Sequence, residues 1–122
     1  MEKFRVLIVD DQLRSRQSLK ALLRALPTVE EIREATNGFE AIRQVEEFQP
    51  DVIVVDAHMP KMNGLEAARR IKATSQQIKI IVLSIDPDLK AEALAAGADA
   101  FFCKGDPPEK LKEILNLARL AT

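Results

Sequence analysis

Short apolar runs alternate along the chain with stretches in which apolar residues recur at helical spacing. Five such runs predict β-strands, at residues 4–9, 30–35, 51–55, 78–83 and 100–103. The run at 51–55 is almost entirely β-branched, which is typical of a strand covered on both faces. The charges within 30–35 predict a strand at the edge of the sheet, where charge discourages unwanted pairing.

The segments between these runs have helical periodicity. A leucine stripe from Leu19 to Leu26 predicts one helix, which ends at Pro27. Three further segments have a similar apolar stripe, and a short alanine-rich helix is expected to open with Asp86 and Pro87. Strands that alternate with helices predict an α/β fold, in which helices cover both faces of a parallel sheet.

Length and charge narrow the class of protein. The chain has 122 residues, which suits a single domain over 1–122. Its 18 lysines and arginines nearly balance its 19 aspartates and glutamates, so we expect no contact with nucleic acid or an anionic membrane surface. No apolar stretch approaches the length of a membrane span. Cys103 is the only cysteine, so no internal disulfide can form, and a cytoplasmic location is expected.

Polar residues that could react or bind a ligand follow four of the five predicted strands. Asp10 and Asp11 follow the first, Asp56 the third, Ser84 the fourth and Lys104 the fifth. In an open α/β sheet the site lies beyond the carboxyl ends of the strands. We therefore expect three carboxylates, one hydroxyl and one amine to converge there.

Three carboxylates in one place must be neutralised, by a retained proton or by a cation. Mg²⁺ suits hard oxygen ligands and substrate phosphate, whereas zinc is not favoured because no histidine or cysteine pair is near. A phosphoryl group could be bound by the cation, by Lys104 and by Ser84. Because Asp56 ends the central strand, it is the best candidate for a carboxylate nucleophile.

The chain resembles the receiver domains of two-component response regulators. The resemblance rests on Asp10-Asp11, the segment from Asp56 to Gly64, Ser84, the Ala-Gly-Ala at 96–98 and Lys104, and it extends from about residue 4 to 120. It implies a flavodoxin-like (βα)5 doubly wound sandwich with strand order 2-1-3-4-5. It also implies a phosphorylation-dependent signalling switch that catalyses its own phosphorylation and dephosphorylation, and not a conventional enzyme.

The resemblance further implies a metal site. Asp11 and Asp56 would bind Mg²⁺ directly, together with the backbone carbonyl of His58. Asp10 would act through a metal-bound water. The only cofactor implied is Mg²⁺.

The resemblance implies roles in phosphoryl transfer as well. Asp56 would accept the phosphoryl group from a sensor histidine kinase, and Lys104 would bind that group. Ser84 would move to hydrogen-bond it, and Phe101 would follow as the second switch residue.

The sequence departs from the usual receiver pattern at two positions, and the segment after Lys104 indicates which receivers it resembles most. Gly105 stands where many members have proline, and the large Ile85 follows the switch hydroxyl. We expect Ile85 to narrow access to the phosphorylated aspartate and slow its hydrolysis. The Lys-Gly-Asp-Pro-Pro-Glu segment is similar to receivers attached to helix-turn-helix transcription regulators. An effector domain, a partner or a homodimer formed on phosphorylation would then transmit the signal.

Three other functions compete with a phosphorylation switch. A Mg²⁺-dependent phosphatase would want a second acid two residues after its nucleophile, where His58 stands. A flavin mononucleotide binder would need a Ser/Thr/Gly-rich phosphate loop in place of Asp10-Asp11, and the chain has no tryptophan or tyrosine to stack on flavin. A receiver-like module that binds a partner without phosphorylation would not need the complete set of three carboxylates, one hydroxyl and one amine.

Overall fold

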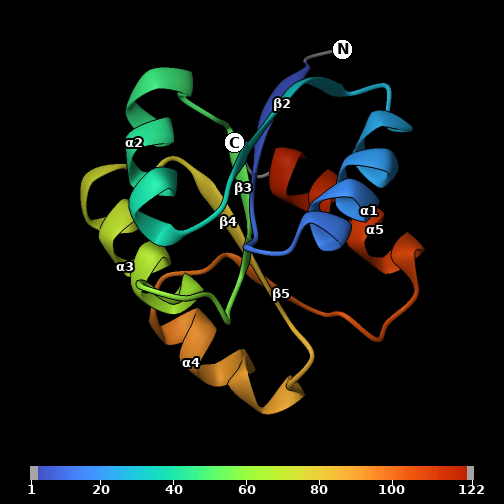
Figure 1. Ribbon diagram of the computed structural model, residues 1–122. Helices are drawn as coiled ribbons and strands as arrows, with labels where there is room; N and C mark the ends of the chain where they lie inside the picture. Colours follow the sequence, from blue (N-terminus) through green and yellow to red (C-terminus); the bar gives the residue numbers. More distant parts are fainter. Residues whose placement is uncertain (1–2, 121–122) are drawn as a thin grey trace.

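The five predicted strands form one parallel sheet. They are β1 (Phe4–Val9), β2 (Val29–Ala35), β3 (Val52–Asp56), β4 (Lys79–Ser84) and β5 (Ala100–Cys103). Their order is β2-β1-β3-β4-β5, so the predicted flavodoxin-like fold and its strand order are confirmed (Figure 1). The computed structural model describes residues 3–120, with only the backbone described for residues 118–120.

Helices cover both faces of this sheet. They are α1 (Leu13–Arg24), α2 (Gly38–Phe48), α3 (Gly64–Thr74), α4 (Lys90–Ala95) and α5 (Pro108–Leu120), with a short 3₁₀ turn, η1 (Pro87–Leu89), directly before α4. In Figure 1, α1 and α5 lie on one face of the sheet, and α2, α3 and α4 lie on the other. None of the helices in the described part of the chain is long and apolar enough to span a membrane.

Two apolar clusters fill the space between the sheet and its helices. Successive side chains of a strand point to opposite faces, so Val6 and Ile8 pack towards α1 and α5, while Leu7 and Val9 pack towards the other helices. The central strand β3 is buried along its whole length, as its β-branched sequence predicted. The outer strand β2 keeps most of its residues at least partly exposed, which confirms the predicted edge.

Two asparagines begin the helices α2 and α3. Each stands directly before a glycine, and an Asn-Gly pair suits both a turn and a helix start. In each case the asparagine is the N-cap and the glycine is the first helical residue, because the asparagine Oδ1 accepts from the backbone N–H three residues later at 2.9 Å. The fourth helix is short, as expected, and the side chain of Asp86 caps its preceding 3₁₀ turn.

Candidate functional site

The carboxyl ends of the strands bring the predicted polar residues to one edge of the sheet. Asp56 is the last residue of β3, Ser84 is the last residue of β4, and Lys104 directly follows β5. Asp10 directly follows β1, which lies beside β3. From β1 the chain continues to β2 on one side of β1, and from β2 it continues to β3 on the other side of β1. The order of the strands therefore reverses between β1 and β3, and the site lies at this point.

Three carboxylates form an acidic cluster at this edge. Asp10, Asp11 and Asp56 each place one carboxylate oxygen within 4.8 Å of the others. Asp10 and Asp56 are buried, whereas Asp11 is exposed. Negative charges this close favour the binding of a cation, and an all-oxygen donor set of this size with one open, solvent-facing side fits Mg²⁺.

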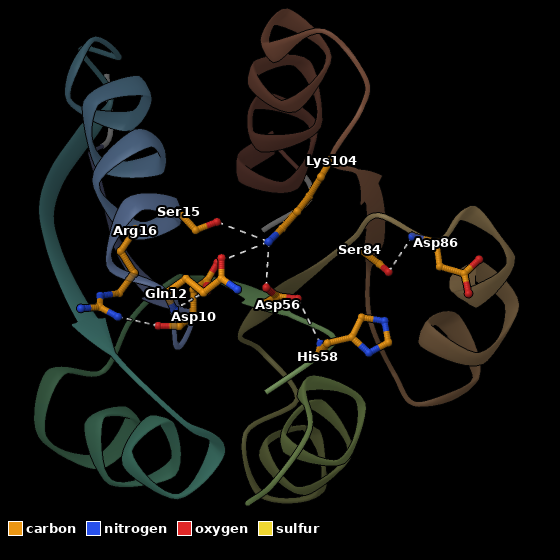
Figure 2. Close-up of polar contacts among 9 residues, drawn as sticks. All are labelled: Asp10, Gln12, Ser15, Arg16, Asp56, His58, Ser84, Asp86 and Lys104. Carbon is orange, nitrogen blue, oxygen red and sulfur yellow. Dashed lines mark hydrogen bonds and ion pairs between the residues drawn. The ribbon is translucent and has the colours of Figure 1, made fainter. Parts of the chain in front are cut away.

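Lys104 is the cation that faces the cluster (Figure 2). Its Nζ lies 2.7 Å from Asp56 Oδ2 and 3.5 Å from Asp10 Oδ2, and it also contacts Ser15 Oγ at 3.3 Å. Burial alone would lower the pKa of Lys104, but the hydrogen bond and charge of Asp56, with the charge of Asp10, outweigh burial and raise that pKa above its ordinary value. Lys104 therefore remains a fixed positive charge beside Asp56.

Backbone amides hold the two buried carboxylates in place. His58 N–H donates to Asp56 Oδ1 at 3.0 Å, and Gln12 N–H donates to Asp10 Oδ1 at 2.9 Å. Each buried carboxylate thus has one oxygen bound by a nearby amide, and its other oxygen faces Lys104. His58 is an exposed residue. Its predicted role uses only its backbone carbonyl and does not require its imidazole ring.

Neither of the two predicted switch residues forms a hydrogen bond with the acidic cluster in the part of the chain that the structure describes. Ser84 is buried, and its Oγ accepts from the backbone N–H of Asp86 at 3.0 Å, so its hydroxyl is turned towards the start of the next loop (Figure 2). Phe101 is half-buried and packs against the apolar core cluster between the sheet and α2, α3 and α4. The peptide bond between Lys104 and Gly105 is trans, as are all others in the described chain.

Glycine is required where α3 begins. A Cβ added to Gly64 would lie 2.1 Å from the carbonyl oxygen of Asp56 and 2.8 Å from its carbonyl carbon. The Gly64 N–H also donates to the carbonyl oxygen of Ala57 at 2.9 Å. The start of α3 is therefore packed directly against the backbone of Asp56.

Two residues that sequence reasoning missed also belong to this region. Ser15 contacts Lys104, and the only sequence signal for it was its place one helical turn after Asp11. Arg16 donates from Nη1 to the carbonyl oxygen of Asp10 at 2.8 Å, and from Nε to Glu34 Oε1 at 3.1 Å. No sequence signal pointed to Arg16, because both of its partners come from other elements of the fold.

An apolar groove opens beside Lys104 between α1 and α5. Its volume is about 520 Å³. The residues that line it include Leu19 and Leu22 of α1, Phe102 of β5 and Leu111 of α5. Ser15 and Lys104 line the groove and also contact each other, so the groove is continuous with the edge of the acidic cluster.

Comparison with known proteins identifies the family. Residues 6–116 match the response regulator receiver domain. The chemotaxis protein CheY of Thermotoga maritima is 40% identical over 114 residues, which span 92% of this chain and 94% of that protein. The transcriptional regulatory protein LiaR of Bacillus subtilis is 39% identical over 120 residues, which span 97% of this chain and 56% of LiaR.

Solved structures agree with this assignment. The response regulator TrrA of Thermotoga maritima, determined in complex with Mg²⁺ and BeF, is 30% identical, with a TM-score of 0.86 over 97% of this chain and 99% of TrrA. The chain thus spans nearly all of some relatives and about half the length of several transcriptional regulators that it matches. The fold, the arrangement of aspartates and lysine at the sheet edge, and these similarities together show that the chain belongs to the receiver domains of two-component response regulators, the family that accepts a phosphoryl group on an aspartate.

Proposed function

We propose that this chain is a single receiver domain over residues 1–122 that accepts a phosphoryl group on Asp56 from the phosphohistidine of a sensor histidine kinase, in a Mg²⁺-dependent reaction. The observation that supports this most directly is the position of the buried Asp56. Its carboxylate lies both within the acidic cluster and 2.7 Å from Lys104. A nucleophile between a cation site and a fixed ammonium is well placed to receive an anionic phosphoryl group.

The donor set fits a divalent cation. Asp11 and Asp56 would hold Mg²⁺ directly, with the carbonyl of His58, and Asp10 would hold it through a water. When bound, Mg²⁺ would neutralise phosphoryl oxygens during transfer. The carboxylates supply oxygen ligands only, which is the chemistry that Mg²⁺ prefers.

The protein residues would perform the transfer as follows. A carboxylate oxygen of Asp56 forms the new P–O bond while the P–N bond to the donor histidine breaks, and the imidazole nitrogen keeps the electron pair. The ammonium of Lys104 would exchange its contact with Asp56 Oδ2 for a contact with a phosphoryl oxygen. Hydrolysis by water would later return the carboxylate and release inorganic phosphate.

The switch residues would respond to the new phosphoryl group. The hydroxyl of Ser84 now accepts from Asp86 N–H and would turn to donate to a phosphoryl oxygen. Phe101, which is half-buried, would move with it. This shifts the population between two states of the domain, which an effector domain, a partner or a second copy of the chain would detect.

The surface around the site is suited to a protein donor. The apolar groove between α1 and α5 reaches Lys104 and lies outside the acidic cluster itself. A donor that packs into the groove could bring its phosphohistidine to Asp56 without burying the carboxylates of the cluster against apolar surface.

The direct test is incubation of the purified chain with acetyl phosphate and MgCl₂, followed by mass spectrometry. The expected result is a mass increase of one phosphoryl group, located at Asp56 after proteolysis and absent in Asp56→Asn. Chelation of Mg²⁺ should abolish the increase. Modification of another residue, or an equal increase in Asp56→Asn, would refute the proposal. Transfer of radiolabelled phosphate from an autophosphorylated histidine kinase would test the donor.

A further inference from the structure

Arg16 links the residue that follows β1 to the end of β2. Its Nη1 donates to the carbonyl oxygen of Asp10 at 2.8 Å, and its Nε pairs with Glu34 Oε1 at 3.1 Å. Arg16 belongs to α1, Asp10 follows β1, and Glu34 lies near the end of β2. Only 13% of the Arg16 side chain is exposed, so these contacts are partly shielded from solvent.

The contact with Asp10 completes the hydrogen bonding of that residue. Asp10 N–H donates to the carbonyl oxygen of Ala35 at 3.1 Å, and the Asp10 carbonyl accepts from Arg16. Asp10 is fully buried, so water cannot readily replace a lost partner of its carbonyl. Without Arg16, the peptide group after Asp10 would have to rotate to find another donor.

Rotation of that peptide group would move Asp11. The peptide bond is planar, so the direction of the Asp10 carbonyl also fixes the direction of the Asp11 N–H and the position of its Cα. The Asp11 side chain is exposed, so surrounding side chains do not hold it. The position of its carboxylate therefore depends on the backbone that Arg16 fixes.

We propose that Arg16 is a positioning residue for the metal-binding loop, held in place by Glu34, and that it sets Mg²⁺ affinity through the backbone of Asp10. This inference rests on the proposed function, because it takes Asp11 to be a Mg²⁺ ligand. Arg16 does not touch the metal or the phosphoryl group. It acts only by fixing the peptide group that joins Asp10 to Asp11.

The charge of Arg16 gives the opposite expectation, which makes the inference testable. A cation near the acidic cluster repels Mg²⁺, so loss of its charge alone would tighten Mg²⁺ binding. Lys20 provides a matched control, because its Nζ pairs with the other oxygen of Glu34 at 2.9 Å but does not contact Asp10. Lys20→Met and Arg16→Met each remove one positive charge that pairs with the Glu34 carboxylate. Only Arg16→Met also removes the hydrogen bond to the Asp10 carbonyl.

The experiment is a calorimetric titration of the full chain with MgCl₂ for wild type, Arg16→Met, Arg16→Lys and Lys20→Met. Loss of residues that orient metal ligands typically weakens metal binding by about 10- to 100-fold. We expect about tenfold or greater weakening in Arg16→Met and affinity within about twofold of wild type in Lys20→Met. Arg16→Lys keeps the charge but lacks the planar fork that reaches both Glu34 and the Asp10 carbonyl, so it should also bind more weakly.

Thermal melts in the presence of a chelator separate positioning from a merely structural role. A merely structural role would lower the melting temperature of Arg16→Met and leave the Mg²⁺ affinity of the folded protein unchanged. Unchanged or tighter affinity in Arg16→Met would therefore overturn the inference. If Arg16→Met does not fold, Arg16→Lys decides by the same criterion. Failure of wild type to bind Mg²⁺ would overturn the proposed function as well, whereas equal binding by wild type and the Arg16 variants would overturn this inference alone.

Discussion

Replacement of Gly64 by alanine tests how closely α3 approaches the phosphorylatable aspartate. The added Cβ would lie 2.1 Å from Asp56 O and 3.0 Å from Ala57 Cα. All of its closest neighbours are backbone atoms, which cannot rotate away as a flexible side chain can. To reach ordinary contact at 3.4 Å, the start of α3 and the end of β3 must separate by about 1.3 Å.

The magnitude follows from three contributions. Overpacking of a well-packed site costs about 1–3 kcal/mol. Separation also lengthens the Gly64 N–H bond to Ala57 O, at a cost of about 1 kcal/mol. Alanine offsets up to about 1 kcal/mol, because it is the better helix former. The net expectation is a loss of about 2 kcal/mol in the free energy of unfolding.

The assay is urea denaturation followed by circular dichroism, with Gly105→Ala as the control. A Cβ at Gly105 meets nothing within 4 Å, so this variant should match wild type or gain up to about 1 kcal/mol from the restricted unfolded chain. Displacement of Asp56 by about 1 Å should also slow its phosphorylation by acetyl phosphate by about 10- to 100-fold in Gly64→Ala only. If Gly64→Ala equals Gly105→Ala in both stability and phosphorylation rate, the close approach does not exist in solution and the reasoning is wrong.

Three further predictions concern the cluster, the edge strand and the rim of the site. Mg²⁺ at millimolar concentration should raise the melting temperature by mass action, and Asp11→Asn should reduce that rise; an equal rise in both proteins would argue against Asp11 as a ligand. The hydrogen bond from Lys20, with help from Arg16, outweighs desolvation and holds the pKa of Glu34 below its ordinary value. These ion pairs therefore stabilise the fold above pH 4.5, and this stabilisation is lost as the pH falls through the lowered pKa. Glu34→Gln should therefore cost up to about 1 kcal/mol at neutral pH in metal-free urea titrations and almost nothing once the pH has fallen below the lowered pKa of Glu34, and a cost independent of pH would contradict the ion-pair explanation. Ile85 is 76% exposed beside the buried Ser84, and Ile85→Ala should shorten the lifetime of the phosphorylated protein measured by mass spectrometry; an unchanged lifetime would show that Ile85 does not shield the acyl phosphate.

Much of the fold follows from local sequence. The alternation of apolar runs with helical stripes predicted every strand and every helix, because the periods of side-chain direction, 2 in strands and 3.6 in helices, are local properties of the backbone. The start of a helix was not determined by the local sequence at Asn37 and Asn63. An asparagine before glycine suits both a turn and an N-cap, and only the bond from its Oδ1 to a later amide separates the two.

The sequence by itself also determined which end of the sheet would hold the site. The strands are parallel, so polar residues that follow them must gather at one edge, and the sequence alone therefore predicts that Asp10, Asp56 and Lys104 lie together. The tertiary structure alone decided the contacts among them. Lys104 meets Asp56 across 48 positions of sequence and Ser15 across 89, and Arg16 meets Glu34 across 18. Such contacts depend on strand order, register and helix packing, which are set by the whole core and by no single stretch of chain.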